Sequence, residues 1–258
     1  VTSASSHALS IAESKRRGLA RSTESLDLTY GDIPFEAVDV AITAAAPPVG
    51  GVLFDLGSGS GHAVIAAALL FDLSRIVGIE LLQDLHVQAS TVLKRFYELP
   101  IAQRGAPTIE LRCGDIFDDT NTFDLGSADI IFVCCVTWDS AIMFKLACRL
   151  AMALRADAKV LTIGKALPAV VEVGNQAASD VDVVRFDEIW HGLAQCEWGQ
   201  EVMVLHRVVP TGLSDLGRAG YSMTECGSVG DEAAAPSHAV SHVRGAQVAR
   251  KSKPCVLS

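Results

Sequence analysis

The sequence predicts an α/β fold built on a doubly wound, mostly parallel sheet. Short apolar runs recur along residues 27–210 without polar alternation, as expected of strands that are buried on both faces. Longer stretches with helical patterning separate these runs, and such an order requires right-handed crossovers within one sheet. A glycine-rich turn joins the first run to the helix that follows it, as in sheets that bind ligands at the ends of their strands.

Five continuous apolar runs predict the strands of the sheet in order. They comprise residues 52–56, 76–79, 109–112, 129–133 and 159–163. Helices are predicted around and between them, over about 36–45, 61–72, 83–97 and 139–154. Two later stretches, near 182–190 and 201–209, are expected to pair as an antiparallel hairpin at one edge of the sheet.

Composition divides the chain into three regions. Residues 1–26 are rich in Ser, Ala and Arg, which predicts a flexible N-terminal segment. Residues 211–258 are rich in Gly, Ser and Ala with little periodicity, which predicts a disordered tail. The predicted strands and helices all fall in residues 27–210, so one domain is expected there. No apolar run reaches the roughly 18–20 residues that span a bilayer.

The net charge of −9 is concentrated in the predicted domain. Residues 1–26 hold four basic and two acidic side chains, and residues 211–258 hold five and four, which leaves −12 on residues 27–210. An acidic domain repels phosphate backbones, so direct DNA binding by this region is disfavoured. None of the seven cysteines forms a CxxC pair, and no Cys/His group has zinc-ligand spacing, so no metal site is predicted.

The glycine-rich turn carries the first indication of a ligand. Shortly after Asp55 the chain reads Gly57-Ser58-Gly59-Ser60-Gly61, which opens an alanine-rich helix. Glycines permit a tight turn and let a ligand approach the backbone at the carboxyl end of a strand. The spacing is GxGxG, whereas dinucleotide binders have GxGxxG. An acid before such a turn suits the amino acid end of S-adenosylmethionine (SAM); the alternative is an ordinary strand-to-helix turn.

Two further acids stand at the ends of predicted strands. Glu80 comes 25 residues after Asp55, where a carboxylate can accept both hydrogen bonds from a ribose diol. Asp115 follows the third strand, where it can accept a hydrogen bond from the adenine amino group while Ile116 lies against the ring. Each acid alone is more often a solvated loop residue. The three in this order predict a SAM site on a Rossmann-like class I methyltransferase domain.

An upstream segment makes the assignment more specific. Residues 29–38 read Thr-Tyr-Gly-Asp-Ile-Pro-Phe-Glu-Ala-Val. This segment resembles the cofactor-covering loop and following helix of the Dot1 family, the histone H3 lysine methyltransferases that lack a SET domain. The resemblance continues through the three acid-bearing motifs and resumes at residues 162–168, Trp198 and Leu205-His206, so that it covers about residues 27–208.

The resemblance implies roles only for residues that match the family. Tyr30, Gly31 and Asp32 would close over the cofactor, although the family usually has Glu at the position of Asp32. Asp55 and the three glycines, Gly57, Gly59 and Gly61, would hold the methionine part, with Ser58 between them. Glu80 would bind the ribose, and Asp115 with Ile116 the adenine.

The departures from the family fall where the acceptor lysine should lie. Cys134 and Cys135 stand where the family usually has a pair of Asn, and a thiol cannot replace an amide that steers an amine. Met203 and Val204 replace Tyr residues, so the aromatic wall of a lysine channel is reduced. Trp198 remains as a candidate for that wall. The candidates on the acceptor side are therefore Cys134, Cys135 and Trp198.

The resemblance implies a protein-lysine N-methyltransferase, with histone H3 as a candidate substrate and a nuclear role. Methyl transfer would then depend on positioning and desolvation more than on acid–base chemistry, since the sequence shows no clear base. Two alternatives stay open. One is a protein that binds SAM without catalysis, and the other is a small-molecule methyltransferase.

The last four residues suggest a different location. They read Cys255-Val256-Leu257-Ser258, behind the basic residues Arg250, Lys251 and Lys253. This is the pattern of a CaaX box for farnesylation beside a small basic patch; the alternative is a chance ending. Prenylation of Cys255 would place the chain at the cytoplasmic face of a membrane, which conflicts with a nuclear role, so the sequence leaves the location open.

Overall fold

The structure is a computed structural model that describes residues 3–16, 31–118, 120, 123–175, 178–196 and 198–210. The chain forms two units, Val1–Gly227 and Ser228–Ser258, and every described residue belongs to the first. Two residues that the sequence singled out, Tyr30 and Cys255, lie outside the described residues. The predicted tail, residues 211–258, lies outside them as well.

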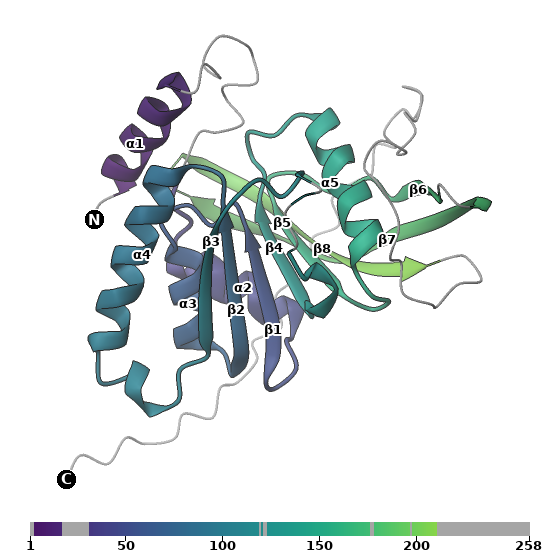
Figure 1. The fold of residues 1–258 in the computed structure, drawn as a ribbon. Helices are drawn as coiled ribbons and strands as arrows, with labels where there is room; N and C mark the ends of the chain where they lie inside the picture. Colours follow the sequence, from purple (N-terminus) through teal and green to yellow (C-terminus); the bar gives the residue numbers. More distant parts are fainter. Residues whose placement is uncertain are drawn as a thin grey trace. The chain divides into compact units, whose positions relative to one another are not determined.

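An eight-stranded sheet organises the domain, with the strand order β3-β2-β1-β4-β5-β8-β7-β6. The strands from β3 to β5 run parallel, and β5, β8, β7 and β6 pair in antiparallel fashion. This confirms the predicted α/β fold with a mostly parallel sheet and an antiparallel edge (Figure 1). The strands are β1 (Gly51–Leu56), β2 (Leu73–Glu80), β3 (Thr108–Cys113), β4 (Ile130–Cys134), β5 (Lys159–Ile163), β6 (Val170–Asn175), β7 (Ala178–Cys196) and β8 (Gly199–Pro210).

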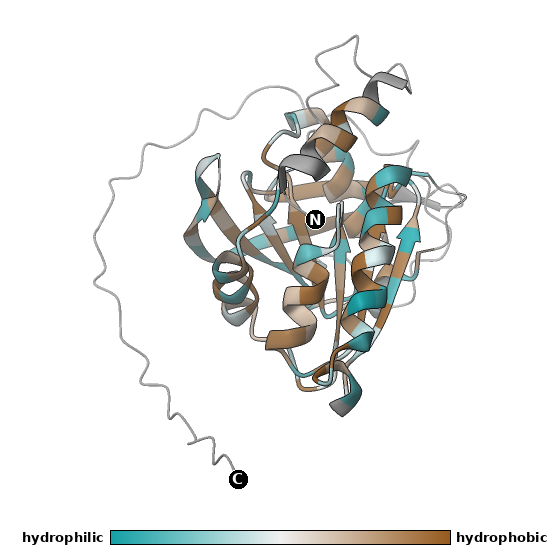
Figure 2. Ribbon diagram, turned by 90° about the vertical axis from the view of Figure 1, so that its left-hand side faces the viewer, coloured by the Kyte–Doolittle hydropathy of each residue, from teal (hydrophilic) through white to brown (hydrophobic). Residues whose placement is uncertain are grey.

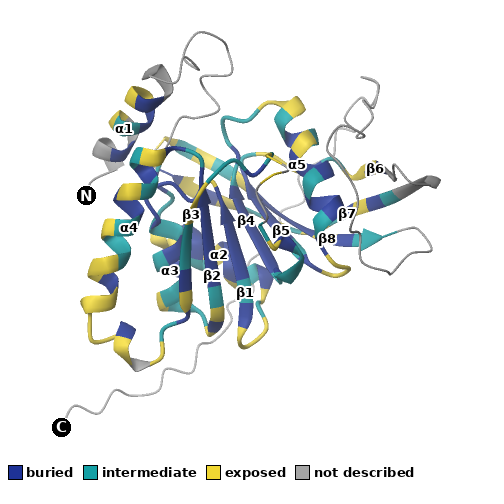
Figure 3. Cartoon of the chain, viewed as in Figure 1, coloured by how far each residue is buried: buried dark blue, intermediate teal, exposed yellow. Residues whose placement is uncertain are grey.

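The central strands are buried on both faces, which explains their continuous apolar sequences. In β1 only Val52 is partly exposed, and in β4 only Cys134. Successive side chains of a strand point to opposite faces, so Leu53 and Phe54 enter two different hydrophobic clusters. Figure 3 shows β1, β2 and β4 buried, whereas exposed residues gather on the helices.

Helices cover both faces of the sheet. α2, α3 and α4 contribute to the cluster that contains Leu53, and α5 lies on the opposite face, over Phe54 (Figure 1). Hydrophobic residues dominate the strands, and hydrophilic residues occur among the helices (Figure 2). Among the described residues, no helix is long and apolar enough to cross a membrane. The helices are α1 (Ser3–Arg16), α2 (Phe35–Ala45), α3 (His62–Leu70), α4 (Gln83–Glu98) and α5 (Ser140–Ala153), with short 3-10 turns at Ala102–Arg104 and Leu125–Ser127.

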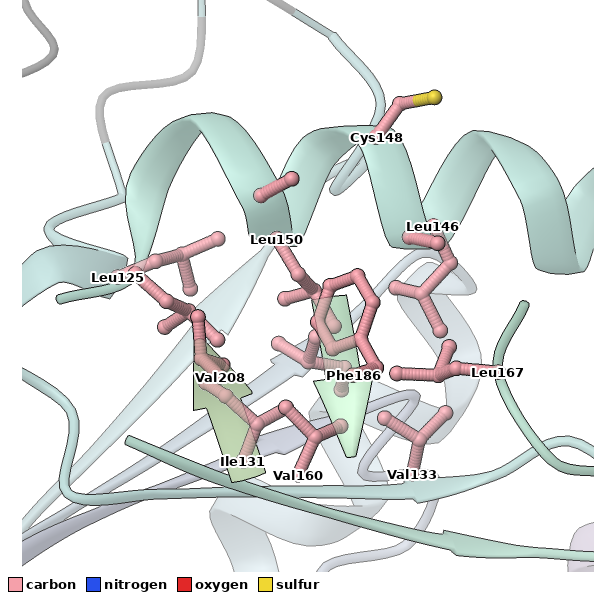
Figure 4. Packing of buried hydrophobic residues seen from close by; sticks show 14 of the residues in the cluster. Leu125, Ile131, Val133, Leu146, Cys148, Leu150, Val160, Leu167, Phe186 and Val208 are labelled. Carbon is pink, nitrogen blue, oxygen red and sulfur yellow. The ribbon is translucent and has the colours of Figure 1, made fainter. Parts of the chain in front are cut away.

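The cluster beneath α5 joins the parallel and antiparallel parts of the sheet. Leu146 and Leu150 of α5 lie with Ile131 and Val160 from parallel strands and with Phe186 from β7 (Figure 4). All five side chains are buried. Because burial of one such side chain contributes about 1.5–3 kcal/mol, the two parts of the sheet are stabilised as one core.

The antiparallel edge is larger than the predicted hairpin. The pairing of β7 with β8 runs from Val184, which lies opposite Pro210, to Cys196, which lies opposite Gly199. The register shifts between Glu188 and Trp190. β6 was not predicted, because its short apolar alternation ends in Gly and Asn, which favour turns. β5 ends opposite Met203, so the last part of the hairpin extends past the carboxyl edge of the parallel strands. The hairpin tip is thereby placed beside the ends of the strands.

The N-terminal segment differs from the prediction of a flexible stretch over residues 1–26. Residues Ser3–Arg16 form α1, which packs against α4 (Figure 1). The composition alone indicated low order, but Ser6 and Glu13 are buried against α4 and bonded to it. The prediction is therefore wrong over residues 3–16, because tertiary contacts stabilise a helix whose own sequence is weakly amphipathic.

Candidate active site

A cavity of about 430 Å³ lies at the carboxyl ends of the parallel strands. Its wall includes Asp55 of β1, Glu80 of β2, Asp115 after β3 and Cys134 of β4. The strand order reverses between β1 and β4, and α/β sheets bind their ligands at such a reversal. The three acids that the sequence placed after successive strands are therefore brought together in one cavity.

Asp55 is a buried acid with an unmet hydrogen-bonding need. It is 2% exposed, and its Oδ2 atom has no hydrogen-bond partner among the described residues. Burial, and to a smaller extent the nearby charge of Glu80, raise the pKa of Asp55 to about 8. An unpaired buried oxygen is costly, so the site suits a ligand that brings a cationic or N–H donor. The ammonium group of an amino acid is such a donor.

The glycine-rich turn shapes the cavity floor. Gly57, Gly59 and Gly61 have φ angles of 82°, 54° and 83°, in the left-handed region that favours glycine. Apart from Gly57 itself and its two chain neighbours, no atom of the described residues lies within 4 Å of the position that a Cβ would take on Gly57. Gly57 lines the cavity together with Ser58. Gly59 and Gly61 support the turn from outside the cavity, where Gly61 precedes α3. The turn therefore leaves room for a ligand next to its backbone.

Glu80 is held rigidly at the end of β2. Its Oε2 accepts a hydrogen bond from the Gly59 N–H at 2.7 Å, and its Oε1 accepts one from the Leu82 N–H, also at 2.7 Å. Burial raises the pKa of Glu80, and these backbone bonds oppose the shift. Each carboxylate oxygen has a further lone pair. Glu80 can therefore accept hydrogen bonds from a diol while it ties the glycine-rich turn to α4.

The third acid lies at the opposite end of the cavity wall. The Phe117 N–H donates to Asp115 Oδ1 at 2.8 Å, which fixes the carboxylate beside the buried side chain of Ile116. The Lys145 ammonium of α5 lies over the Phe117 ring, 4.6 Å from its centroid, and lines the cavity. This part of the cavity wall therefore combines a carboxylate with apolar and aromatic side chains, which suits a flat ligand group with a polar edge.

The segment before α2 closes one side of the cavity. Gly31 lines it, and a Cβ on Gly31 would lie 2.4 Å from a ring carbon of Trp198. Asp32 does not line the cavity but binds His62, with Oδ1 and Nδ1 2.6 Å apart, and accepts a longer hydrogen bond from Ser60. His62 does line the cavity. The predicted covering residues Gly31 and Asp32 therefore lie at the site, tied to the hairpin and to α3.

The two adjacent cysteines at the end of β4 occupy different environments. Cys134 lines the cavity, and burial raises the pKa of its thiol far above the ordinary value, which argues against a nucleophilic role. Cys135 is fully buried on the other side, in the cluster beneath α5, where its thiol donates to the carbonyls of Ile163 and Lys165. Burial raises the pKa of Cys135 to about 11. The structure therefore does not support Cys135 as a channel residue.

Trp198 is also placed differently from the sequence hypothesis. Its ring packs on Gly31 and is 41% exposed, and its Nε1–H donates to Glu201 at 2.9 Å. It does not line the cavity. Trp198 therefore acts on the site through the covering segment.

Several cavity residues were missed by sequence reasoning. His62 directly follows the glycine-rich turn, which is a signal that could have identified it. A larger group comes from the starts of α4 and α5, whose sequences show ordinary helix patterns and give no such signal. These further lining residues include Leu82, Leu85, Thr137, Trp138, Ile142 and Lys145.

The residues present fit SAM. The unpaired oxygen of Asp55 suits its ammonium group, the open space over Gly57 its amino acid part, and Glu80 its ribose. Within the described part of the chain, no group of three or more His, Cys, Asp or Glu side chains is arranged to hold a metal ion.

The model of the family described as "Histone methylation protein DOT1" matches residues 11–190. No curated protein matches the chain. Among solved structures, an RNA methyltransferase from Salinibacter ruber with S-adenosyl-L-homocysteine is 22% identical, with a TM-score of 0.48, over 72% of this chain and 98% of that one.

A second structure is phosphoethanolamine N-methyltransferase 1 from Haemonchus contortus, in complex with phosphoethanolamine and S-adenosylhomocysteine. It is 14% identical, with a TM-score of 0.50, over 84% of this chain and 52% of that one, so this chain spans about half its length. A likeness at this identity shows the fold alone. The family model, in contrast, matches more than half of the 258 residues, and the chain therefore belongs to the DOT1 family of SAM-dependent methyltransferases.

Proposed function

We propose that the chain transfers a methyl group from SAM to a lysine side chain of a protein. The observation that carries the proposal is the single cavity in which Asp55, Glu80 and Asp115 converge beside Cys134. The three acids account for the three parts of SAM, and the family membership favours a protein acceptor.

Each cofactor residue has a distinct task in this proposal. SAM, when bound, supplies an activated methyl group. Asp55 pairs with the ammonium of its amino acid part, and Glu80 accepts hydrogen bonds from the ribose hydroxyls. Asp115 accepts from the adenine amino group, with Ile116 and Phe117 against the ring. Holding both reactants in one orientation supplies much of the rate enhancement in transfer reactions of this kind.

Three uncharged side chains form the wall that we assign to the acceptor. Ile33, Phe132 and Cys134 line the cavity next to the cofactor residues, and the Cys134 thiol stays protonated because burial raises its pKa. An apolar wall disfavours a charged ammonium and so lowers the pKa of an entering lysine. The wall thereby favours the neutral amine that attacks the methyl group, without a dedicated base.

The test is incubation of the purified chain with SAM that carries a tritiated methyl group and with total cell protein. We expect label on protein, released by hydrolysis as methylated lysine, and loss of the label with Glu80→Ala. Nucleosomes are included as a separate substrate, and we expect weak labelling because residues 27–210 carry a charge of −12. Label only in low-mass compounds would instead indicate a small-molecule methyltransferase. Cofactor binding without any label would indicate a binding protein.

A further inference from the structure

The N-terminal helix caps a helix of the candidate active site. Glu13 of α1 is 4% exposed, and its two carboxylate oxygens accept hydrogen bonds from the N–H groups of Gln83 and Asp84, each at 2.9 Å. These are the first two residues of α4. Leu82, at the N-cap position, makes no side-chain capping bond. Glu13 of α1 therefore provides an anionic cap for α4, whose own N-cap residue provides none.

The turn that Glu13 binds also belongs to the cavity. The Leu82 N–H donates to Glu80 Oε1, so two buried carboxylates accept bonds from three consecutive backbone N–H groups. Leu82 lines the cavity, as do its neighbours Leu81 and Leu85. One carboxylate comes from β2 and the other from α1, and the two are close enough for the charge of Glu13 to raise the pKa of Glu80. The position of the turn thus depends on both acids.

We propose that α1 is part of the cofactor site, with Glu13 as a positioning residue for the adenosyl half of SAM. Glu13 holds the turn at residues 81–84, and through the Leu82 N–H this turn holds the Glu80 carboxylate toward the ribose. Loss of Glu13 leaves two N–H groups at the start of α4 without their acceptor, and the turn relaxes away from the cavity. The inference rests on the proposed use of SAM and is independent of the acceptor.

The test compares Glu13→Ala, Glu13→Gln and Ser6→Ala in the full-length chain. Ser6 is a matched control, since its hydroxyl oxygen accepts from Gln88 Nε2 at 2.8 Å and thus joins the same two helices away from the cavity. Calorimetry measures the Kd of S-adenosylhomocysteine and of 5′-methylthioadenosine, which has no amino acid part. Thermal unfolding of each variant without ligand measures whether α1 stabilises the fold.

We expect Glu13→Ala to weaken binding of both ligands by about tenfold. This factor is the usual free-energy cost of losing one helix cap, converted to a change in Kd. Glu13→Gln keeps one acceptor oxygen and is expected to fall between Glu13→Ala and the wild type. Ser6→Ala should bind both ligands within about twofold of the wild type. If both ligands lose affinity by the same factor, the weakened contacts are those to the adenosyl half, because the two ligands share only that part.

Unchanged Kd values in folded Glu13 variants, with only a lower unfolding temperature, would make α1 a purely stabilising element and overturn the inference. An equal loss of affinity in Ser6→Ala would also overturn it, because the effect would then come from undocking of α1 in general. If the wild type itself failed to bind, the cofactor assignment would fail together with the inference. Normal binding without methyl transfer to protein would leave the inference intact and contradict the proposed function alone.

Discussion

The two halves of the cavity differ in how their side chains are held. On the cofactor side, Glu80 and Asp115 each accept hydrogen bonds from backbone N–H groups, and Asp55 lies within a buried strand. On the proposed acceptor side, Cys134 lines the cavity, and it is one of the residues that depart from the family pattern. The proposed cofactor residues are therefore fixed by backbone hydrogen bonds or by burial within a strand, whereas the proposed acceptor side lacks the polar side chains that the family has there.

The largest expected effect is on the cofactor half. Glu80→Ala removes the acceptor for two backbone N–H groups and, in the proposed complex, for the ribose, so a loss of roughly 1–3 kcal/mol corresponds to about fivefold to 150-fold weaker binding of S-adenosylhomocysteine. Equilibrium dialysis with labelled ligand measures it. Glu110→Ala is the control, because Glu110 pairs with Arg75 and Arg112 and does not line the cavity. Equal affinity of Glu80→Ala and wild type would refute the ribose role.

The next effect is a pH dependence of cofactor binding. The pKa of Asp55 is raised to about 8, so this group is mostly protonated at pH 6, whereas its pairing with an ammonium requires the carboxylate. Affinity for S-adenosylhomocysteine should therefore rise by up to about tenfold per pH unit as pH increases from 6 to 8. Asp55→Asn should flatten the profile. A flat profile in the wild type would show that Asp55 does not bind the ammonium.

The raised pKa of Asp55 also determines how the stability of the ligand-free protein changes with pH. The folded state keeps the proton on Asp55 to about pH 8, whereas the unfolded chain releases it near the ordinary aspartate pKa of 3.8. The contribution of Asp55 to the free energy of unfolding therefore falls as pH rises between these values. Glu80 acts in the same direction, because its pKa is also raised.

A smaller effect distinguishes Cys134, which lines the cavity, from Cys135, which does not. Cys134→Asn places an amide in the cavity wall, so the rate of methyl incorporation into protein should change severalfold while affinity for S-adenosylhomocysteine stays within about twofold. Cys135→Asn enlarges a fully buried side chain, and we expect a loss of about 1–3 kcal/mol of stability instead. Turnover, affinity and thermal unfolding are measured for both variants. A change in affinity with Cys134→Asn would place Cys134 in the cofactor half.

The smallest expected effect concerns the covering segment. A Cβ on Gly31 would overlap the Trp198 ring, so Gly31→Ala must displace the segment that lines the cavity. We expect a two- to fivefold weaker binding of S-adenosylhomocysteine, on the order of 1 kcal/mol or less. Trp198→Ala in the same chain removes the overlap and should restore part of the loss. No rescue in the double variant would mean that the contact with Trp198 does not position this segment.

The convergence of the three acids in one cavity could be predicted from the sequence because these residues follow from local rules. A carboxylate at the end of a buried strand, or a glycine with positive φ after it, can be recognised from a few neighbouring residues, as with Asp55, Gly57 and Glu80. The separation of Cys134 from Cys135 also follows from strand alternation, yet only the packing beneath α5 decides which side faces the cavity.

Other parts of the site depend on contacts between distant segments. Glu13 accepts hydrogen bonds from residues about 70 positions further along the chain. Trp198 packs on Gly31, although the two are far apart in the sequence. The sequence around Glu13 has the composition of a flexible segment, and its helix becomes recognisable only through its contacts with α4. Such long-range pairs cannot be read from motif spacing, which is why the predicted boundary at residue 27 left α1 out of the domain.

The most direct test of the account is titration calorimetry of the wild-type chain with S-adenosylhomocysteine. The account predicts saturable binding at one site per chain, because Asp55, Glu80 and Asp115 line one cavity. A folded wild-type chain that gives no binding heat at several temperatures and does not bind the labelled ligand in dialysis would contradict the cofactor site, and with it the proposed methyl transfer.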